Sequence, residues 1–511
     1  MTIPDAGGAA LIGIDVGTSS LRALAFDAAG RKLAGASRPT PTVPAPTGGE
    51  HDPEAIFMAV LAVLADVGRE LAGRPVAGMA VASFGESCVL VDAAGRALAP
   101  AIVWHDRRTE AAALAIGERL DPARGFALTG HAVDPTFTLF KLAWMREYWP
   151  EAMRNARRVL MMADWIALRL CGEAATDQTL ASRTFYFDIH RRRWSEELLT
   201  LAGIDPALPA PLRPSGTALA RVRAEVLAAT GLAGQPAVGV GGHDHIIGFF
   251  GAGLSAPGAM VDSLGTAEAV LLATAAPLTD PAVIARGYFQ GAIATDRAMS
   301  YLGGGIYMSG GAIEWLRGIT GGATHAGLIA EAAAVPPGAN GVMFLPHLGN
   351  GPPPTPDRDA RGAFVGLTAA ATRGTLYRAL LEGLALQARL MVDGMEALAG
   401  AGAVAVIRAI GGGSRNPLFV QIKANCFGRP LTVIDEADAS ALGAALLGGV
   451  AAGLFSSLAD GLAGLVRPEH TVEPDGDAGR YAVLREVVFA HLQPALQPVN
   501  RHLAELARRA T

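Results

Sequence analysis

A carboxylate, Asp15, stands at the end of an apolar run and is followed directly by Gly17, Thr18 and Ser19. A buried strand rarely carries an ionised carboxylate without a partner or a metal ion. Glycine lets backbone N–H groups approach phosphate oxygens closely, and the two hydroxyls add donors. Mg²⁺ takes one or two carboxylates together with phosphate oxygens. The stretch 11–22 therefore favours a phosphate-binding turn with Asp15 beside Mg²⁺.

Two more glycine-rich turns follow apolar runs, at Gly265-Thr266 and at residues 411–414, GGGS. Any one such turn is more typical of an ordinary hairpin. Three of them in one chain, together with Asp15 and Asp244, favour a nucleotide-binding protein.

Asp244 lies between His243 and His245, directly after an apolar run that ends in two glycines. One interpretation is an N-cap for a helix that begins near His245, because aspartate is favoured there. Another is a general base that accepts a proton from a substrate hydroxyl during phosphoryl transfer. The two are compatible. The His-Asp-His triplet also suggests a metal site, although adjacent residues rarely converge on one ion.

Other polar side chains stand where apolar strands stop. Glu86 follows the strand predicted over 76–84, and Trp104 and Asp106 follow the apolar residues that begin at Ala101. Folds of the α/β class place ligands at such strand ends, while a solvated surface loop is an equally good interpretation of each.

The elements that position these residues are read from the hydrophobic pattern. Residues 12–16, 21–27 and 32–37 predict three antiparallel strands, which argues against a Rossmann or P-loop unit because both need a helix directly after the turn. A second strand, turn and strand at 258–274 indicates two related halves. Further predictions are a loop at 38–46, a helix at 51–71, strands at 89–92, 235–242 and 404–410, and a helical C-terminal tail.

Composition bounds the rest. The 511 residues are 51% apolar and 17% charged, which indicates a folded protein with two large domains. A net charge of −5 favours neither nucleic acid nor an anionic membrane surface as partner. Three scattered cysteines favour a reduced cytoplasm over a disulfide framework. The uncharged stretch 439–459 is rich in Ala and Gly, so we expect a helix inside a domain and not a membrane span.

Taken together, these stretches resemble the FGGY family of carbohydrate kinases. The resemblance runs in order from about residue 10 to residue 455. It rests on D-x-G-T-x-x-x-R at 15–22, W-x-D-x-R at 104–108, TDQTLASRT at 176–184, HDH at 243–245, SLGT at 263–266 and GGGSRNPLFVQIKANCFGRPL at 411–431.

The resemblance implies an α/β protein with the actin-like ATPase fold, in which two ribonuclease-H-like domains flank a central cleft. It implies an N-terminal sugar-binding domain over 1–253 and a C-terminal nucleotide-binding domain with a helical tail over 254–511. ATP and Mg²⁺ would be the cofactors. Asp244 would be the catalytic base, and Asp15 and Asp244 would lie at the metal. The implied sugar contacts are Glu86, Trp104, Asp106, Thr136 and His245, and the implied nucleotide contacts are Gly17, Thr18, Ser19, Arg22, Gly265, Thr266, Gly310, Glu314, Gly412 and Asn416.

The chain departs from the family pattern in ways that bear on the substrate. Glycerol kinases carry an arginine just before the glutamate and an aromatic residue after D-P, where this chain has Gly85 and Thr136. Xylulose kinases carry Met-His at positions 85 and 86 and asparagine where this chain has His245. The family's G-E-R-x-P loop is replaced at 349–354 by GNGPPP.

We expect phosphorylation of a primary hydroxyl on a small ketose or polyol, with a pentulose-like substrate favoured. The expected partner is this small molecule, and a homodimer is an open alternative. Two other functions are weighed. An actin-like ATPase with a protein partner would need a longer segment after the second domain, and a catalytically silent sugar sensor would be expected to lack Asp15 or Asp244, which this chain has.

Overall fold

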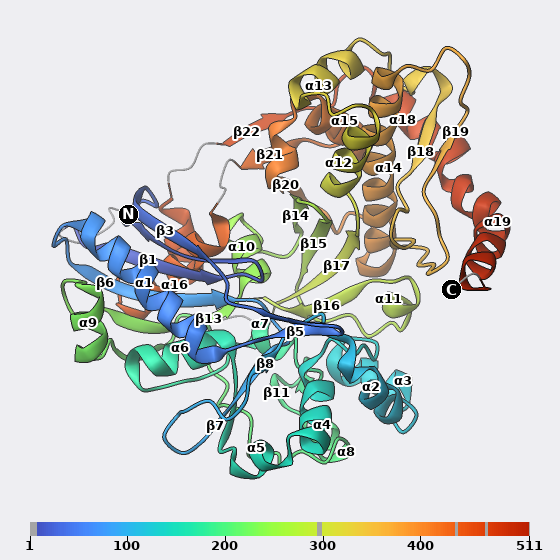
Figure 1. Ribbon diagram of the computed structural model, residues 1–511. Coiled ribbons are helices and arrows are strands. Elements are labelled where there is room, and N and C mark those ends of the chain that lie inside the picture. The colour runs from blue at the N-terminus through green and yellow to red at the C-terminus, as the bar shows by residue number, and fades with distance from the viewer. Residues whose placement is uncertain (1–7, 294–298, 435–437, 466–468, 510–511) are drawn as a thin grey trace.

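The computed structural model describes residues 8–293, 299–434, 438–465 and 469–509. Two lobes, each built around one mixed β-sheet with helices packed on it, make up the molecule (Figure 1). Within the described ranges, no helix is long and apolar enough to cross a membrane.

The first lobe has a six-stranded sheet in the order β12-β13-β6-β1-β2-β3. Its strands are β1 (Ala10–Val16), β2 (Ser20–Phe26), β3 (Lys32–Pro39), β4 (Val43–Ala45), β5 (Gly48–His51), β6 (Val76–Ser83), β7 (Cys88–Val91), β8 (Ala101–Ile102), β9 (Arg158–Met161), β10 (Phe187–Asp188), β11 (Arg193–Trp194), β12 (Ala218–Arg221) and β13 (Ala237–His243). Its helices are α1 (Pro53–Leu71), α2 (Glu110–Gly117), α3 (Pro122–Thr129), α4 (Thr138–Tyr148), α5 (Pro150–Asn155), α6 (Met162–Cys171), α7 (Gln178–Ala181), α8 (Glu196–Leu201), α9 (Ala224–Thr230) and α10 (Asp244–Gly251).

The second lobe has a seven-stranded sheet in the order β16-β17-β15-β14-β20-β21-β22. Its strands are β14 (Ala259–Leu264), β15 (Glu268–Thr274), β16 (Phe289–Ala292), β17 (Ser300–Ile306), β18 (Met343–Leu345), β19 (Ala363–Val365), β20 (Val406–Ile410), β21 (Leu431–Ile434) and β22 (Glu469–Val472). The helices of this part of the chain are α11 (Ala282–Ala285), α12 (Gly310–Ile319), α13 (His325–Ala333), α14 (Arg373–Ala399), α15 (Pro417–Phe427), α16 (Ala439–Ala451), α17 (Leu458–Ala463), α18 (Ala478–Leu484) and α19 (Ala490–Arg509).

The opening meander is confirmed. Strand β1 pairs antiparallel with β2, and β2 pairs antiparallel with β3. On its other side β1 pairs parallel with β6, which pairs parallel with β13. The carboxyl ends of β1, β6 and β13 therefore meet at one edge of the first sheet. Strands β14 and β20 are likewise parallel neighbours in the second sheet.

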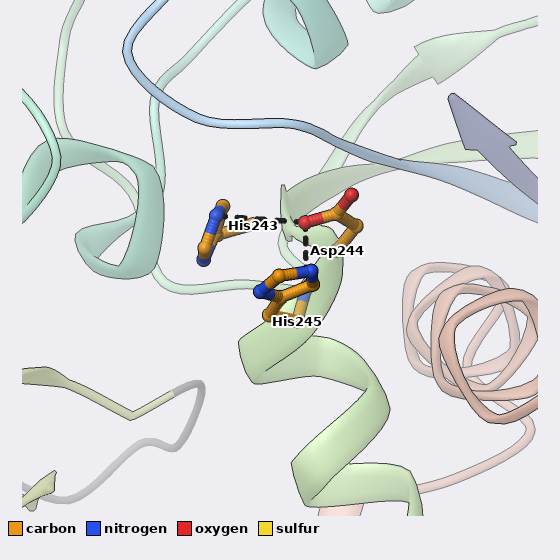
Figure 2. A group of neighbouring side chains, drawn as sticks. All are labelled: His243, Asp244 and His245. Carbon is orange, nitrogen blue, oxygen red and sulfur yellow. Dashed lines mark hydrogen bonds and ion pairs between the residues drawn. The ribbon is translucent and has the colours of Figure 1, made fainter. Parts of the chain in front are cut away.

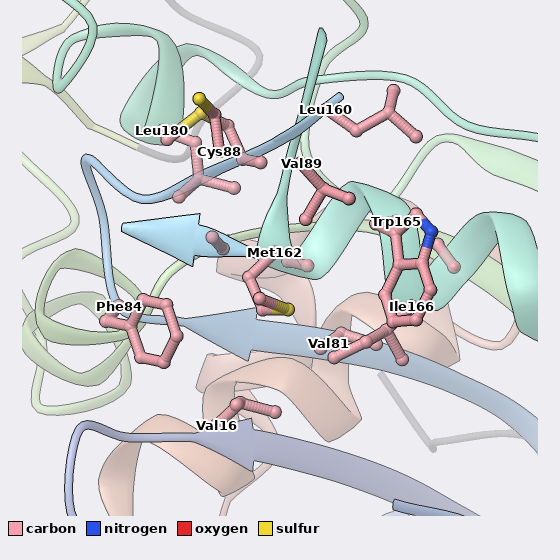
Figure 3. Packing of buried hydrophobic residues seen from close by; sticks show 14 of the residues in the cluster. Val16, Val81, Phe84, Cys88, Val89, Leu160, Met162, Trp165, Ile166 and Leu180 are labelled. Atoms are coloured by element: carbon pink, nitrogen blue, oxygen red, sulfur yellow. The ribbon is translucent and has the colours of Figure 1, made fainter. Parts of the chain in front are cut away.

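The core of the first lobe lies between its sheet and helices α1 and α6. Val16, Val81 and Phe84 from the strands pack with Met162 and Trp165 of α6 (Figure 3). Trp165 is completely buried. Burial of a large apolar side chain contributes about 1.5–3 kcal/mol, so this layer holds the strand ends in place.

Helix α16 returns from the second half of the chain to the first sheet, where it packs on β1, β6 and β13 (Figure 1). The approach is close enough to require glycine. A Cβ on Gly13 would lie 1.7 Å from the carbonyl oxygen of Ala441, and one on Gly78 would lie 2.0 Å from that of Gly448. The uncharged stretch is thus a helix inside the protein, as expected. The predicted division between residues 253 and 254 falls between the strands of the two sheets. It assigns α16 to the C-terminal domain, although this helix packs on the first sheet.

One loop prediction is wrong. Residues 38–46 were expected to form a loop because they are rich in proline, but β3 continues to Pro39 and Val43–Ala45 pairs with Gly48–His51 as a short hairpin. Proline is tolerated at such edge positions, where its missing N–H is not needed for pairing.

Candidate active site

Three carboxylates gather at the edge where β1, β6 and β13 end. Asp15 is the penultimate residue of β1, Glu86 follows β6, and Asp244 follows β13. The register aligns these ends, because Ser83 of β6 is paired with Val16 on one side and with His243 on the other. Ligands of α/β proteins bind at such edges.

Asp15 sits in a charged cluster. Its Oδ2 accepts a hydrogen bond of 2.9 Å from Nε of Arg22, and a second guanidinium nitrogen of Arg22 lies 2.7 Å from Oδ1 of Asp438. Burial and the neighbouring Asp244 carboxylate raise the pKa of Asp15 to about 6, in spite of Arg22. Two buried carboxylates side by side favour a bound cation.

Asp244 is the first residue of α10, and His243 stands at the N-cap position without a capping hydrogen bond from its side chain (Figure 2). The N-cap interpretation of Asp244 is thus off by one residue, although Oδ1 of Asp244 accepts from the backbone N–H of His245. Burial raises the pKa of Asp244, and the nearby Glu86 carboxylate raises it further, while His245 and Arg22 oppose both. A carboxylate with a raised pKa is better suited to hold a proton that it has taken from a hydroxyl.

The same residues include a possible metal cluster. Ligand atoms of His243, Asp244 and His245 all lie within 4.8 Å of one another. Neutral imidazole suits transition metals, whereas Mg²⁺ prefers oxygen. The oxygen pair formed by Asp15 and Asp244 therefore fits Mg²⁺ better than the histidine triplet does.

Glu86 is buried and held by an arginine that the sequence analysis did not single out. Nε of Arg183 donates to Oε1 of Glu86 over 2.6 Å, and a second guanidinium nitrogen pairs with the same oxygen. Arg183 passes where a side chain at position 85 would be, because a Cβ on Gly85 would lie 2.9 Å from its Cγ. Glu86 also has a positive φ of 59°, a strained conformation that is concentrated at functional sites.

Trp104 connects the loop after β8 with the Gly17-Thr18-Ser19 turn. Its indole Nε1 donates to Oγ1 of Thr18 over 3.0 Å. The carbonyl of Trp104 accepts from Nζ of Lys141 over 3.1 Å, and the carbonyl of Thr136 accepts from the same ammonium. Lys141 is completely buried, and that burial lowers its pKa to about 8. One lysine thus fixes two loops that carry expected sugar contacts, while the Thr136 hydroxyl itself donates to Asp134.

Asp106, another expected sugar contact, has its carboxylate occupied by neighbouring donors of the protein. It is 1% exposed, and its oxygens accept from the backbone of Gly49 and Arg108, from the hydroxyl of Thr47 and from the Arg108 guanidinium. These bonds outweigh burial and lower its pKa to about 2. The side chain holds its own loop, so we do not include it among the proposed sugar contacts.

The expected nucleotide contacts of the second lobe line one cavity of about 610 Å³. Its lining includes Gly265, Thr266, Gly310, Glu314, Gly412 and Asn416. A neighbouring cavity of about 540 Å³ shares Gly265, Thr266 and Gly412 and also includes Arg22 and His245 of the first lobe. The pair of cavities therefore joins the second lobe to the carboxylate edge of the first.

The residues present fit a nucleotide phosphate chain. A Cβ on Gly310 would lie 2.6 Å from the carbonyl oxygen of Gly265, so these two backbones approach as only glycine allows. Gly412 has nothing within 4 Å of a built Cβ and faces open space. Gly17, Thr18 and Ser19 line neither cavity, and their proposed phosphate contacts rest on the resemblance and on Thr18's bond to Trp104.

Comparisons with known proteins agree with this architecture. The model of the FGGY family of carbohydrate kinases, N-terminal domain, matches residues 10–251, and that of the C-terminal domain matches residues 260–452. A glycerol kinase of Aromatoleum aromaticum is 36% identical over 91% of this chain and 94% of its own length. A glycerol kinase of Gloeobacter violaceus is 32% identical over 94% of this chain and 96% of its own. The crystal structure of a xylulose kinase from Rhodospirillum rubrum superposes with a TM-score of 0.86 at 29% identity, covering 96% of this chain and all of that one.

Proposed function

This chain belongs to the FGGY family of carbohydrate kinases, and we propose that it transfers the γ-phosphoryl group of ATP to a primary hydroxyl of a small neutral ketose or polyol, a pentulose-like one being favoured. The observation that carries this proposal is the carboxylate edge formed by Asp15, Glu86 and Asp244, opposite the glycine-lined cavities of the second lobe.

In the proposed mechanism Asp244 accepts the proton of the reacting hydroxyl. The freed oxygen forms its bond to the γ-phosphorus as the bond from phosphorus to the bridging oxygen breaks, which leaves a phosphorylated sugar and ADP. When bound, ATP supplies the phosphoryl group and Mg²⁺ offsets the negative charge of the phosphates. Asp15 would hold the metal, and backbone N–H groups at Gly265 and Thr266 would bind phosphate oxygens.

The sugar would bind in the first lobe. Glu86 would accept hydrogen bonds from hydroxyls, Trp104 would offer an apolar face, and His245 would lie beside the reacting group. Asp15, Glu86 and Asp244 oppose two arginines, Arg22 and Arg183, so the site carries no surplus positive charge for a sugar acid. This balance favours a neutral substrate.

The relatives named glycerol kinase make glycerol the second candidate substrate. Against it stand Gly85 and Thr136, where glycerol kinases carry an arginine and an aromatic residue. The small side chain of Thr136 leaves room for a substrate longer than glycerol, whereas the space at position 85 is taken by Arg183. Arg183 supplies a guanidinium near position 85, however, so both substrates belong in the test.

The deciding experiment is a coupled assay of ADP release by the purified protein with Mg·ATP and a panel of ketoses, polyols, aldoses and sugar acids, glycerol and gluconate included. We expect strong stimulation by a neutral ketose or polyol of about four to six carbons. Stimulation by gluconate alone would contradict the charge argument, and no stimulation by any member, with ATP bound, would favour the silent sensor.

Asp244→Asn tests the base. We expect turnover to fall about 10³-fold or more, since the amide cannot accept the proton, while the affinities for sugar and ADP stay close to those of the wild type. Single-turnover kinetics and calorimetric binding measure the two quantities separately. Unchanged turnover would exclude Asp244 as the base.

A further inference from the structure

A completely buried ammonium group lies in the second lobe beside the nucleotide cavity. Nζ of Lys423 is 2.7 Å from Oδ2 of Asp262 and 2.7 Å from Oε1 of Glu268, and all three side chains have 0% exposure. The ammonium also lies 5.3 Å from the ring centres of Phe419 and Phe427. Lys423 falls in the apolar run PLFVQIKANCF, so the sequence alone showed a charge that needed a partner.

The three charged residues come from elements that end at the nucleotide cavity. Asp262 lies on β14, and Glu268 is the first residue of β15, so the Gly265-Thr266 turn lies between them. Lys423 lies on α15, whose N-cap is Asn416. The cluster therefore joins the second phosphate turn to the helix that follows the 411–414 turn.

A fourth group extends the cluster to α12. Oγ of Ser309, the N-cap residue of α12, donates to Oε2 of Glu268 over 2.8 Å. The backbone N–H groups of Ser309 and Gly311 donate to the carbonyl of Thr266, and that of Gly310 donates to the carbonyl of Gly265. Glu268 thus holds Ser309, the residue at which α12 begins and is hydrogen-bonded to the Gly265-Thr266 turn.

The cluster is poorly explained by stability alone. Buried ion pairs contribute little net stability because desolvation offsets their attraction. Here two carboxylates share one ammonium, and Oδ1 of Asp262 has no hydrogen-bond partner in the described part of the chain. What the arrangement does supply is a fixed geometry between β14, β15, α12 and α15.

We propose that Lys423, Asp262, Glu268 and Ser309 form a clamp that positions the Gly265-Thr266 turn and the start of α12 for the phosphates of the nucleotide, and so sets affinity for nucleotide and not for sugar. These four are positioning residues, because Gly265 and Thr266 line the two cavities and none of the four does. The inference rests on the proposed nucleotide site of the second lobe.

The test measures the dissociation constant of Mg·ADP by calorimetry in the wild type, Ser309→Ala, Glu268→Ala, the double variant and Glu268→Gln. We expect Ser309→Ala to weaken ADP binding about tenfold, the size of one lost hydrogen bond to a charged group, and Glu268→Ala to weaken it at least as much, because it also removes a partner of Lys423. The double variant should bind no worse than Glu268→Ala, because alanine at position 268 already leaves the Ser309 hydroxyl without this acceptor. Glu268→Gln keeps an acceptor for Lys423 and a partner for Ser309, so it should bind within a few-fold of the wild type.

Two controls separate positioning from general loosening. Ser457→Ala removes the N-cap hydroxyl of α17, away from the nucleotide cavities, and should leave ADP binding unchanged. The KM for the sugar should stay unchanged in every variant. Scanning calorimetry identifies any variant that fails to fold. If Glu268→Ala fails to fold, the comparison of Glu268→Gln with Ser309→Ala still tests the clamp.

The outcomes distinguish the two proposals. Ser309→Ala and Glu268→Ala proteins that bind ADP as the wild type does, or that lose ADP and sugar affinity equally, would overturn the clamp while leaving the kinase proposal intact. A wild type that binds no ADP would overturn the proposed function itself.

Discussion

At the scale of single residues, the site is governed by carboxylates whose surroundings differ. Asp15 and Asp244 are buried next to each other with raised pKa values, while Asp106 is surrounded by donors that lower its pKa to about 2. Aspartate thus has two different roles here. Asp15 and Asp244 are suited to bind a cation or a proton, whereas Asp106 stabilises its own loop.

The raised pKa of Asp15 gives a prediction for stability against pH. The folded protein binds the Asp15 proton more tightly than the unfolded chain, whose pKa is near 3.8. The unfolding free energy of the unliganded protein should therefore fall as pH rises from about 4 to about 6, by about 3 kcal/mol at most from this group. Urea denaturation across this range measures the slope.

In Asp15→Asn this decline should become shallower by the contribution of Asp15, while Asp164, Glu268 and Asp244, whose pKa values are also raised, keep the rest of it. The variant should be more stable than the wild type above pH 6 and less active. Asp106→Asn is the control, because the contribution of Asp106 is present above pH 4 and is lost only as the pH falls towards 2. A slope between pH 4 and pH 6 that Asp15→Asn leaves untouched would contradict the assignment.

At the scale of elements, buried cations connect segments that the site needs. Lys141 of α4 holds the loops of Trp104 and Thr136, Arg183 holds Glu86 at the end of β6, and Lys423 holds the second phosphate turn. Each donates from its side chain to at least one residue that is more than thirty positions away in the chain, so each fixes a geometry that neither partner could keep alone.

Lys141→Met should affect the sugar and spare the nucleotide. The substitution keeps the length and apolar stem of the side chain but leaves the carbonyls of Trp104 and Thr136 without their donor, at a cost of about 1–3 kcal/mol for an unsatisfied group. We expect the KM for sugar to rise about tenfold and the KM for ATP to stay unchanged. Equal changes in both values would argue for a loss of fold and against a positioning role.

Gly13→Ala probes the contact between the first sheet and α16. The added Cβ would collide with the carbonyl of Ala441, so we expect a loss of about 3 kcal/mol or more of unfolding free energy. Gly318→Ala is the matched control: it lies in α12 with nothing within 4 Å of its Cβ, and alanine should leave stability equal or slightly higher. Equal denaturation midpoints for the two variants would contradict the close approach.

Hydrophobic pattern predicted the local elements well, including the meander of β1, β2 and β3 and the strands that lead to Glu86 and Asp244. What it missed are partnerships across long distances in the chain. The residues 439–459 showed that a helix is buried, but not that it lies on the first sheet. Arg183 stood inside a recognised motif without a role, because its partner Glu86 is 97 positions away. Hydrophobic periodicity indicates which face of a helix or strand is buried, but it does not indicate which other element packs on that face.

At the scale of the whole molecule, the two lobes meet through a buried apolar cluster, in which Ile247 of α10 joins Val261 of β14, and through polar contacts near β16 and β17. Arg192 of the first lobe donates to the carbonyl of Met299 over 2.8 Å, and the backbone N–H of Ala292 donates to Oγ of Ser182 over 2.9 Å. These polar contacts lie at the β16 and β17 side of the second sheet, whereas the cavity lined by Arg22 and His245 also includes Ser263 of β14 and Ile410 of β20.

We expect the lobes to close when both substrates are bound, since closure excludes water from the transfer step. Small-angle X-ray scattering should show a smaller radius of gyration with sugar and a non-hydrolysable ATP analogue together than with either alone. Asp244→Asn should close in the same way, because it keeps both binding sites. A radius that stays constant under all conditions would contradict the closure.

The return of α16 to the first sheet also bears on how the protein is made. A chain leaves the ribosome from its N-terminus, and its domains generally fold in that order. Here the first sheet is covered on one face by Ala439–Ala451, which is synthesised after most of the second lobe. Until then the apolar residues and bare glycine backbone of β1 and β6 lack their native cover. The nascent protein therefore exposes an apolar, aggregation-prone sheet face through most of its synthesis. We expect it to need chaperones most during that interval.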